Sequence, residues 1–234
     1  EAYVHLSTDE TTLTFYYDNN RSSRNGKTWG IDENIYNFFG SRVSAWAGTY
    51  YSPNKVVTKV VFDASFQNFH PTTTNSWFYN LKALTTIEGL ENLNTSNVQY
   101  AYSMFVNCVS LKVLDLSSWD MSKVTDIAEM FYNCSALTTI YSSGAWKCEA
   151  SNDMFTNCDA LQGAVKYDAS KTDVSMANHE GYFTKKAPTA LSRTVLNARK
   201  VKGIYTLQGK RVDGKRQHLP AGVYIVDGVL EVRR

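Results

Sequence analysis

The chain has 234 residues, 43% of them apolar, and its 24 Lys and Arg against 22 Asp and Glu leave a net charge of +2. A chain of this length and composition can hold one or two globular domains. No run of about 18 apolar residues occurs, so the sequence predicts no transmembrane segment.

The first segment, residues 1–56, opens with two runs of alternating apolar residues around a polar turn. The runs comprise Ala2, Val4 and Leu6, then Leu13, Phe15 and Tyr17. Alternation at period two predicts a β-hairpin, and we expect this hairpin to cap the array of repeats that follows. The chain begins EAYVHLS, without Met or an apolar leader. We therefore expect that an export signal has been removed.

Residues 57–186 contain one motif in four copies, centred on a phenylalanine. The copies read WFYNLKAL (77–84), MFVNCVSL (104–111), MFYNCSAL (130–137) and MFTNCDAL (154–161). The conserved columns hold Phe78, Phe105, Phe131 and Phe155, then Asn80, Asn107, Asn133 and Asn157, then Leu81, Cys108, Cys134 and Cys158. Self-similarity at a period of 20–50 residues is typical of repeat arrays.

Each copy leads into a predicted strand. LKVLDL (111–116) matches the L-x-x-L-x-L strand of leucine-rich repeats, with Leu111, Leu114 and Leu116 facing inward and Val113 and Asp115 outward. Equivalent strands are expected at LTTIEG (84–89), LTTIYS (137–142), KVVFD (59–63) and, weakened, LQGAV (161–165). The apolar spacing in SKVTDIAEMFYNC (122–134) predicts a short helix between strands.

These patterns predict the fold class. We expect an α/β leucine-rich-repeat solenoid of about five rungs, with an N-terminal β cap and a small C-terminal all-β domain. The predicted domains are residues 1–56, 57–186 and 187–234.

The cysteine column is interpreted as packing, because its first member is Leu81 and free Cys behaves as a small hydrophobe. Neighbouring rungs could also bring Cys108 and Cys134 together, so a disulfide remains an alternative. A zinc site is disfavoured, since no C-x-x-C pair occurs and the four histidines are scattered. The phenylalanine column is expected to be core as well. The asparagines are expected to satisfy backbone groups where each helix ends.

The outward positions of the strands form the candidate partner face, since repeat arrays usually bind through one sheet face. Its residues are Thr86, Glu88, Val113, Asp115, Thr139 and Tyr141. The face carries no ladder of charges or aromatic rings, so the sequence locates a binding surface without identifying the partner.

The C-terminal segment, residues 187–234, follows a linker at KKAPTALSRT (185–194) and alternates at period two. Turns are expected at Gln208-Gly209 and at Asp227-Gly228. The segment carries 10 Lys and Arg against 3 acids, whereas residues 1–186 carry 14 against 19. This asymmetry fits either an interacting tail or a solvated small domain.

Two resemblances arise from these motifs. Residues 94–141 resemble the BspA-like leucine-rich repeats of bacterial surface proteins through their Met-Phe, Cys and Leu columns. GIYTLQGKRV (203–212), LPAGVYIV (219–226) and VRR (232–234) resemble the C-terminal sorting domain of type IX secretion in Bacteroidota. Together they imply an exported protein at the cell surface or outer membrane, which binds host or bacterial surface proteins without catalysis and meets the export machinery through residues 187–234.

Other functions have weaker support. No G-x-S-x-G, H-E-x-x-H, P-loop or Rossmann fingerprint occurs, so we expect no enzyme, no metal and no cofactor. A carbohydrate-binding module is the alternative, with Tyr141, Trp29 and Trp46 as the aromatic candidates and Trp77, Trp119 and Trp146 expected to pack. Nucleic-acid binding is set aside, because only the basic tail favours it.

Overall fold

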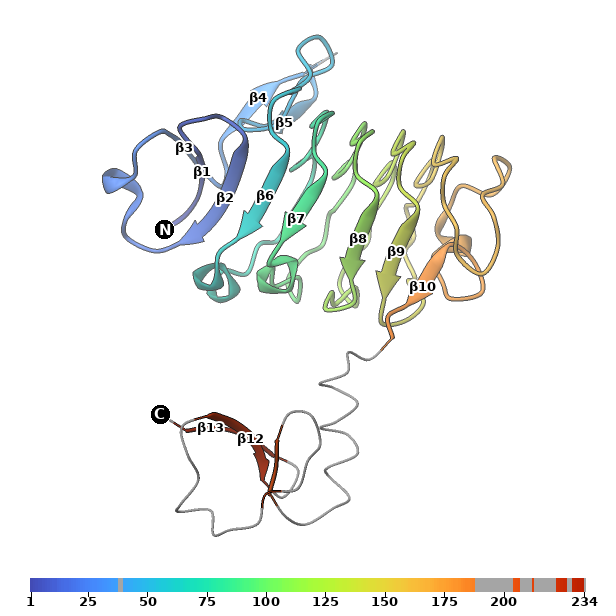
Figure 1. Cartoon of the computed structure of the whole chain (residues 1–234). Helices are drawn as coiled ribbons and strands as arrows, with labels where there is room; N and C mark the ends of the chain where they lie inside the picture. Colours follow the sequence, from blue (N-terminus) through green and yellow to red (C-terminus); the bar gives the residue numbers. More distant parts are fainter. Residues whose placement is uncertain (38–39, 188–203, 207–211, 213–221, 227–228, 234) are drawn as a thin grey trace. The chain divides into compact units, whose positions relative to one another are not determined.

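The computed structural model describes residues 1–37, 40–187, 204–206, 212, 222–226 and 229–233 (Figure 1). The chain divides into two compact units, Glu1–Lys186 and Ala187–Arg234.

The N-terminal hairpin is confirmed. Strands β1 (Ala2–Leu6) and β2 (Thr12–Tyr17) pair antiparallel, with Val4 opposite Phe15. The 3₁₀ turn η1 (Arg21–Ser23) leads to β3 (Lys27–Gly30), which pairs with the free edge of β1. On its other edge β2 runs parallel to β6, so the hairpin covers the first strand of the repeat segment.

Two sheets carry the strands of the repeat segment. β6 (Lys59–Phe62) and β7 (Thr86–Glu88) complete a mixed sheet in the order β3-β1-β2-β6-β7. β8 (Val113–Leu116), β9 (Thr139–Ser142) and β10 (Phe183–Lys185) form a second, parallel sheet in the order β10-β9-β8. A separate hairpin of β4 (Asn34–Tyr36) and β5 (Arg42–Ser44) interrupts the N-terminal segment. The 3₁₀ turns η3 (Ala64–Asn68), η4 (Leu90–Asn92) and η5 (Val174–Met176) lie between strands.

The weakened strand expected at 161–165 does not form. Gln162 makes only an isolated antiparallel bridge to Lys166. A Cβ on Gly163 would lie 2.2 Å from the carbonyl oxygen of Gly181, and Ala164 donates to that same oxygen at 2.9 Å. The returning chain therefore occupies this place, and β10 supplies the strand beside β9.

The short helices expected in the repeats are also absent, because the backbone turns left-handed at two places in every copy. The positive-φ residues lie two before and two after each phenylalanine: Ser76 and Asn80, Ser103 and Asn107, Glu129 and Asn133, Asp153 and Asn157. A left-handed residue at every fourth position breaks the i→i−4 bonds of an α-helix. Local turns replace them, as in Tyr132 N–H to Glu129 O, and other N–H groups bond to the next copy, as in Phe131 to Met154 O at 2.9 Å.

The predicted α/β leucine-rich-repeat solenoid of about five rungs is therefore wrong. The described part of the chain contains strands, turns and 3₁₀ turns but no α-helix. Its strands form a mixed sheet and a separate parallel sheet instead of one continuous ladder. The causes are the left-handed residues in each motif copy, the end of β7 at Glu88, directly before the left-handed Gly89, and the missing strand at 161–165.

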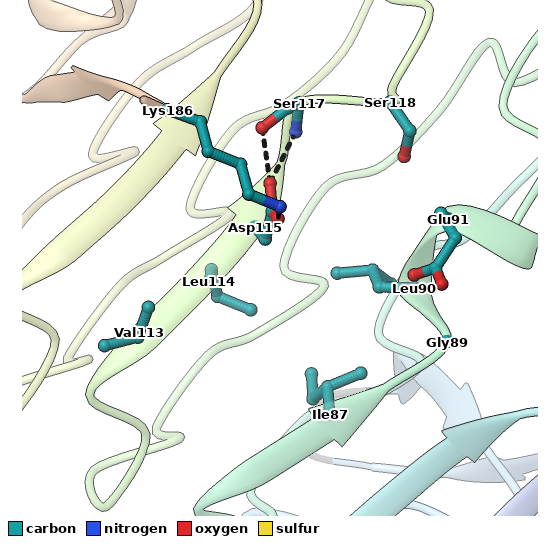
Figure 2. A pocket seen from close by; sticks show the side chains of 10 residues that line it. All are labelled: Ile87, Gly89, Leu90, Glu91, Val113, Leu114, Asp115, Ser117, Ser118 and Lys186. Carbon is teal, nitrogen blue, oxygen red and sulfur yellow. Dashed lines mark hydrogen bonds and ion pairs between the residues drawn. The ribbon is translucent and has the colours of Figure 1, made fainter. Parts of the chain in front are cut away.

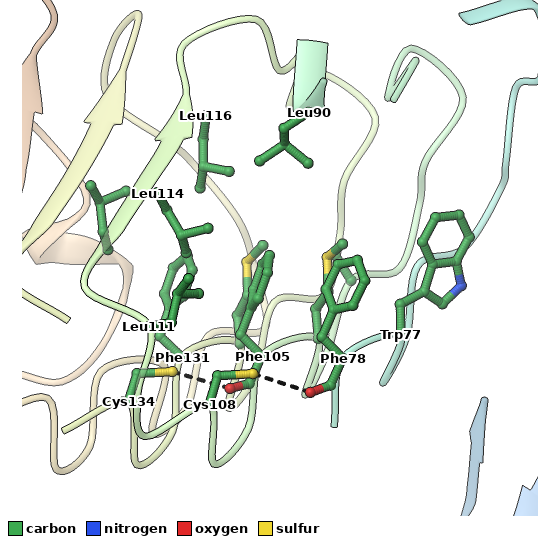
Figure 3. Close-up of a cluster of buried hydrophobic side chains, with 14 of the residues drawn as sticks. Trp77, Phe78, Leu90, Phe105, Cys108, Leu111, Leu114, Leu116, Phe131 and Cys134 are labelled. Atoms are coloured by element: carbon green, nitrogen blue, oxygen red, sulfur yellow. Dashed lines mark hydrogen bonds between the residues drawn. The ribbon is translucent and has the colours of Figure 1, made fainter. Parts of the chain in front are cut away.

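The phenylalanine column forms the centre of the core (Figure 3). Phe131 lies between Phe105 and Phe155, with ring centroids 5.7 and 5.6 Å away and nearly parallel planes. All four phenylalanines of the column are fully buried. Offset parallel rings add to the free energy that burial alone contributes.

The cysteine column lies beside the rings. Cys108, Cys134 and Cys158 are fully buried, and all four cysteines of the chain are free thiols. Each buried thiol donates to the carbonyl oxygen of a phenylalanine in the copy before it, at 3.0 to 3.1 Å. The column therefore holds thiols in place of the disulfide that neighbouring copies could have formed.

The asparagine column differs from the expectation that it satisfies backbone groups. Only Asn80 does so, through Nδ2 to the carbonyl oxygen of Thr49. Asn133 donates instead to the side-chain oxygen of Asn107 at 2.8 Å, and Asn157 donates to that of Asn133 at 2.6 Å. These residues form a side-chain ladder at a left-handed position that Asn tolerates better than most residues.

The C-terminal unit contains a small antiparallel sheet of β11 (Ile204–Thr206), β12 (Gly222–Val226) and β13 (Val229–Arg233). β12 and β13 pair with Val226 opposite Val229, as a hairpin between these runs predicts. The linker from Pro188, the turns at Gln208-Gly209 and Asp227-Gly228, and Arg234 lie outside the described residues.

Candidate functional site

The structure divides the six residues of the predicted partner face between two sheets. Val113 and Asp115 of β8 lie directly beside Thr139 and Tyr141 of β9. Thr86 and Glu88 lie on β7, in the other sheet. Val113 is 49% exposed, whereas its neighbour Leu114 is buried. The inward and outward alternation predicted for this strand is confirmed.

The face is interrupted between β7 and β8. Backbone hydrogen bonds link successive copies at one equivalent position, from Thr85 to Thr58, from Thr138 to Lys112 and from Gln162 to Thr138. Among the described residues, the step from Lys112 to Thr85 has no such bond. β7 is therefore the edge strand of one sheet, and β8 is the edge strand of the other.

The interruption originates at Gly89, which has a left-handed φ of 66°. A Cβ at this position would lie 2.3 Å from the carbonyl oxygen of Phe62, so the close approach requires glycine. Asn92 donates to the same oxygen at 3.0 Å. These contacts pull the chain after β7 toward the end of β6, and Leu90 is buried in the space that results.

A hollow of about 370 Å³ lies at this interruption (Figure 2). Ile87, Leu90 and Leu114 give it apolar walls, whereas its rim is polar. The rim residues are Glu91, Asp115, Ser117, Ser118 and Lys186. An apolar centre with a polar rim is the usual anatomy of a protein-binding surface.

Asp115 is the electrostatic centre of the hollow. It forms an ion pair with Lys186, which follows β10, and accepts hydrogen bonds from the backbone N–H and the hydroxyl of Ser117. Partial burial alone would raise the pKa of Asp115, but Lys186 and Ser117 outweigh it and lower that pKa. The same contact raises the pKa of Lys186. Both side chains are therefore charged at neutral pH.

The aromatic candidates for glycan binding are only partly accessible. Trp46 is 2% exposed, because it packs in the core and donates its indole N–H to the carbonyl oxygen of Trp77 at 2.8 Å, so its predicted role as an exposed platform is wrong. Trp29 is half-buried beneath the Lys27 ammonium, and Tyr141 is half-buried on β9. Three tyrosines that are more exposed than these candidates lie in residues 34–51: Tyr36, Tyr50 and Tyr51.

The remaining tryptophans pack as expected. Trp77, Trp119 and Trp146 are each at most 6% exposed. Trp119 and Trp146 stack with nearly parallel planes and centroids 6.3 Å apart.

The residues described here offer noncovalent binding groups. Burial raises the pKa of Cys158 to about 12 and that of Cys134 well above its usual value, so neither thiol is a nucleophile at neutral pH. Across the described ranges, no three His, Cys, Asp or Glu residues gather in a geometry that could hold a metal ion. All helices there are 3₁₀ turns of 3 to 5 residues, too short to cross a membrane.

Sequence reasoning missed the hollow, although two signals mark it. The copies of the motif step by 27 residues from Phe78 to Phe105 and by 26 to Phe131. In addition, Gly89 stands where the other strands have Leu116 and Ser142. A glycine in a strand often marks a bend or a close approach of another backbone segment. Lys186 had no comparable signal, because its contact spans 71 residues of sequence.

Comparison with known protein families finds a match to the repeat segment. Residues 57–172 match the family model described as "Mycoplasma protein of unknown function, DUF285". No curated protein and no solved structure matches the chain. The match covers the repeat segment from its first residue to residue 172, and its description assigns no activity.

Proposed function

We propose that this chain is a non-enzymatic, exported surface protein that binds a host or microbial protein through its outward strand face. The observation that carries the proposal is the hollow at Val113–Asp115, where an exposed apolar residue adjoins a polar rim. The resemblance of residues 94–141 to bacterial surface proteins supports the same function.

The chemistry of the face suits a protein partner. Strands β8 and β9 present Val113, Thr139 and Tyr141 in adjacent positions. The ion pair of Asp115 and Lys186 adds charge beside them. On the other sheet Glu88 of β7 forms an ion pair with Lys59 of β6 at 2.8 Å. Apolar contact surrounded by charge gives both affinity and orientation.

An array of host and bacterial surface proteins, probed with the purified chain, tests this function. Val113→Lys places a charge on the face, and the lysine side chain stays outside the core because position 113 is half-exposed. We expect it to abolish the array signal. Val56→Lys is the matched control, since Val56 is 50% exposed and lies before β6. Equal signals from both variants would refute binding through this face.

Export is the second part of the proposal and is supported by the resemblance of residues 203–234 to type IX sorting domains of Bacteroidota. Residues 187–234 form a separate compact unit with their own antiparallel sheet. Deleting them should abolish surface display in the native host while the remaining chain still binds its partner. Display that survives the deletion would argue against a sorting role.

Carbohydrate binding is the second candidate, favoured by exposed tyrosines outside the strand face. Tyr36 is 71% exposed, and the Arg42 guanidinium lies 5.1 Å from its ring centroid. Exposed aromatic rings can stack on sugar rings. A glycan array with the chain and its Tyr36→Ala variant tests this candidate, which fails if no glycan signal depends on Tyr36.

A further inference from the structure

The facing edges of β7 and β8 present main-chain groups that no strand in the described part of the chain uses. Thr86 donates to Thr58 on the β6 side, so by alternation the N–H and C=O of Ile87 point to the opposite edge. Thr139 of β9 donates to Lys112, so Val113 and Asp115 turn their main-chain groups toward β7. Both edges border the hollow of Figure 2.

Such edges are templates for another strand. An extended peptide that pairs with an exposed sheet edge gains main-chain hydrogen bonds, and its alternate side chains give specificity. Here two edges face one hollow, with Leu90 and Leu114 as apolar walls for a side chain.

The charges around the hollow select the kind of peptide. Among the described residues, its rim carries two acids, Glu91 and Asp115, and one basic residue, Lys186. Lys186 is already paired with Asp115, yet its side chain is 48% exposed. An ion pair this exposed is weak and exchanges readily. Once Lys186 moves away, the charged rim residues that remain in the described part of the chain, Glu91 and Asp115, are both acidic.

We propose that the hollow between β7 and β8 binds an extended segment of a partner protein that carries a lysine or arginine, and that Lys186 occupies the cation position in the free chain. The segment pairs with the edges at Ile87 and Val113, and its cation replaces Lys186 on Asp115. This inference rests on the proposed function, because it specifies what the strand face recognises.

The probe is a phage library of random linear peptides of about six residues, the usual length of a strand. The library is panned against the full chain, and the enriched peptide is then synthesised with a fluorescent label. We expect enriched sequences to combine Lys or Arg with β-branched residues. Fluorescence anisotropy measures the Kd for the chain and its variants. Failure to enrich any peptide above the bare support would overturn the proposal.

Two pairs of variants distinguish binding in the hollow from a general effect of charge. Lys186→Gln should tighten binding about threefold to tenfold by removing the competing cation, whereas Lys185→Gln, with the same charge change on β10, should leave it within about twofold. Asp115→Asn should weaken binding about tenfold or more, and the exposed Asp159→Asn should not. Equal effects within either pair would overturn the proposal.

Main-chain pairing has its own test. Peptides methylated at alternate amide nitrogens keep their side chains and charge but lose strand hydrogen bonds, so we expect them to bind about tenfold more weakly. Unchanged affinity would refute strand pairing. If Val113→Lys abolishes binding on the protein array but the chain selects no peptide, the proposed function stands and peptide binding in the hollow is refuted.

Discussion

Replacing Phe131 with Ala should destabilise the first unit more than any substitution on its surface. Phe131 is fully buried and lies between two parallel rings, those of Phe105 and Phe155. Burial of a Phe side chain contributes about 1.5–3 kcal/mol, and each ring pair adds about 0.5–1.5 kcal/mol. The total of roughly 2.5–6 kcal/mol brackets the usual loss of about 3–5 kcal/mol for Phe→Ala, so we expect about 4 kcal/mol.

Urea unfolding monitored by tryptophan fluorescence measures this loss of stability in the first unit, Glu1–Lys186. All five tryptophans belong to the first unit: Trp29, Trp46, Trp77, Trp119 and Trp146. Tyr100→Ala is the control, because Tyr100 is 45% exposed, and we expect it to cost less than about 1 kcal/mol. A loss below about 1 kcal/mol for Phe131→Ala would show that the phenylalanine column does not form the core.

Three further predictions concern the thiols, the asparagine ladder and the N-terminal hairpin. Cys134→Val should change the free energy of unfolding by less than about 1.5 kcal/mol, and alkylation under denaturing, non-reducing conditions should find four free thiols; two would establish a disulfide. Asn133→Ala and Asn133→Gly both remove the side-chain amide. The Ala variant should lose about 1 kcal/mol more free energy of unfolding than the Gly variant, because position 133 has a left-handed φ of 59°. Equal losses in urea unfolding would contradict a left-handed backbone at this position. Partial burial would raise the pKa of Asp18, but bonds from Tyr3 and Arg24 lower it. The charged Asp18 carboxylate therefore contributes its full stability above its unfolded-state pKa, and this contribution is lost as pH falls below about 4. Asp18→Asn should make the free energy of unfolding depend less on pH in this acidic range. An unchanged pH dependence would refute the contribution of Asp18.

Strands β6 to β9 were predictable because their signal is local. Alternation of buried and exposed residues in LKVLDL gives the faces of β8 correctly, and the same pattern locates β6, β7 and β9. The turns were not predictable in this way. Apolar residues three and four apart in 122–134 fit a helix, but the left-handed φ at Glu129 and Asn133 makes successive tight turns with similar spacing.

The site was predictable only in part. Outward strand positions gave Val113 and Asp115 at the hollow, whereas the gap itself depends on a contact between Gly89 and the carbonyl oxygen of Phe62. The ion pair of Asp115 with Lys186 requires β10 to lie beside β9, and the weak apolar pattern of residues 161–185 does not show that pairing. Contacts made across such sequence distances depend on tertiary packing.

Amide hydrogen exchange of the full chain, with and without the selected peptide, tests the account of the site most directly. The N–H groups of Ile87, Val113 and Asp115 face the open edges, so we predict that peptide binding slows their exchange. The amide of Leu114, which faces β9, should change little. Protection confined to residues outside β7 and β8, or no protection at saturating peptide, would contradict binding between these strands.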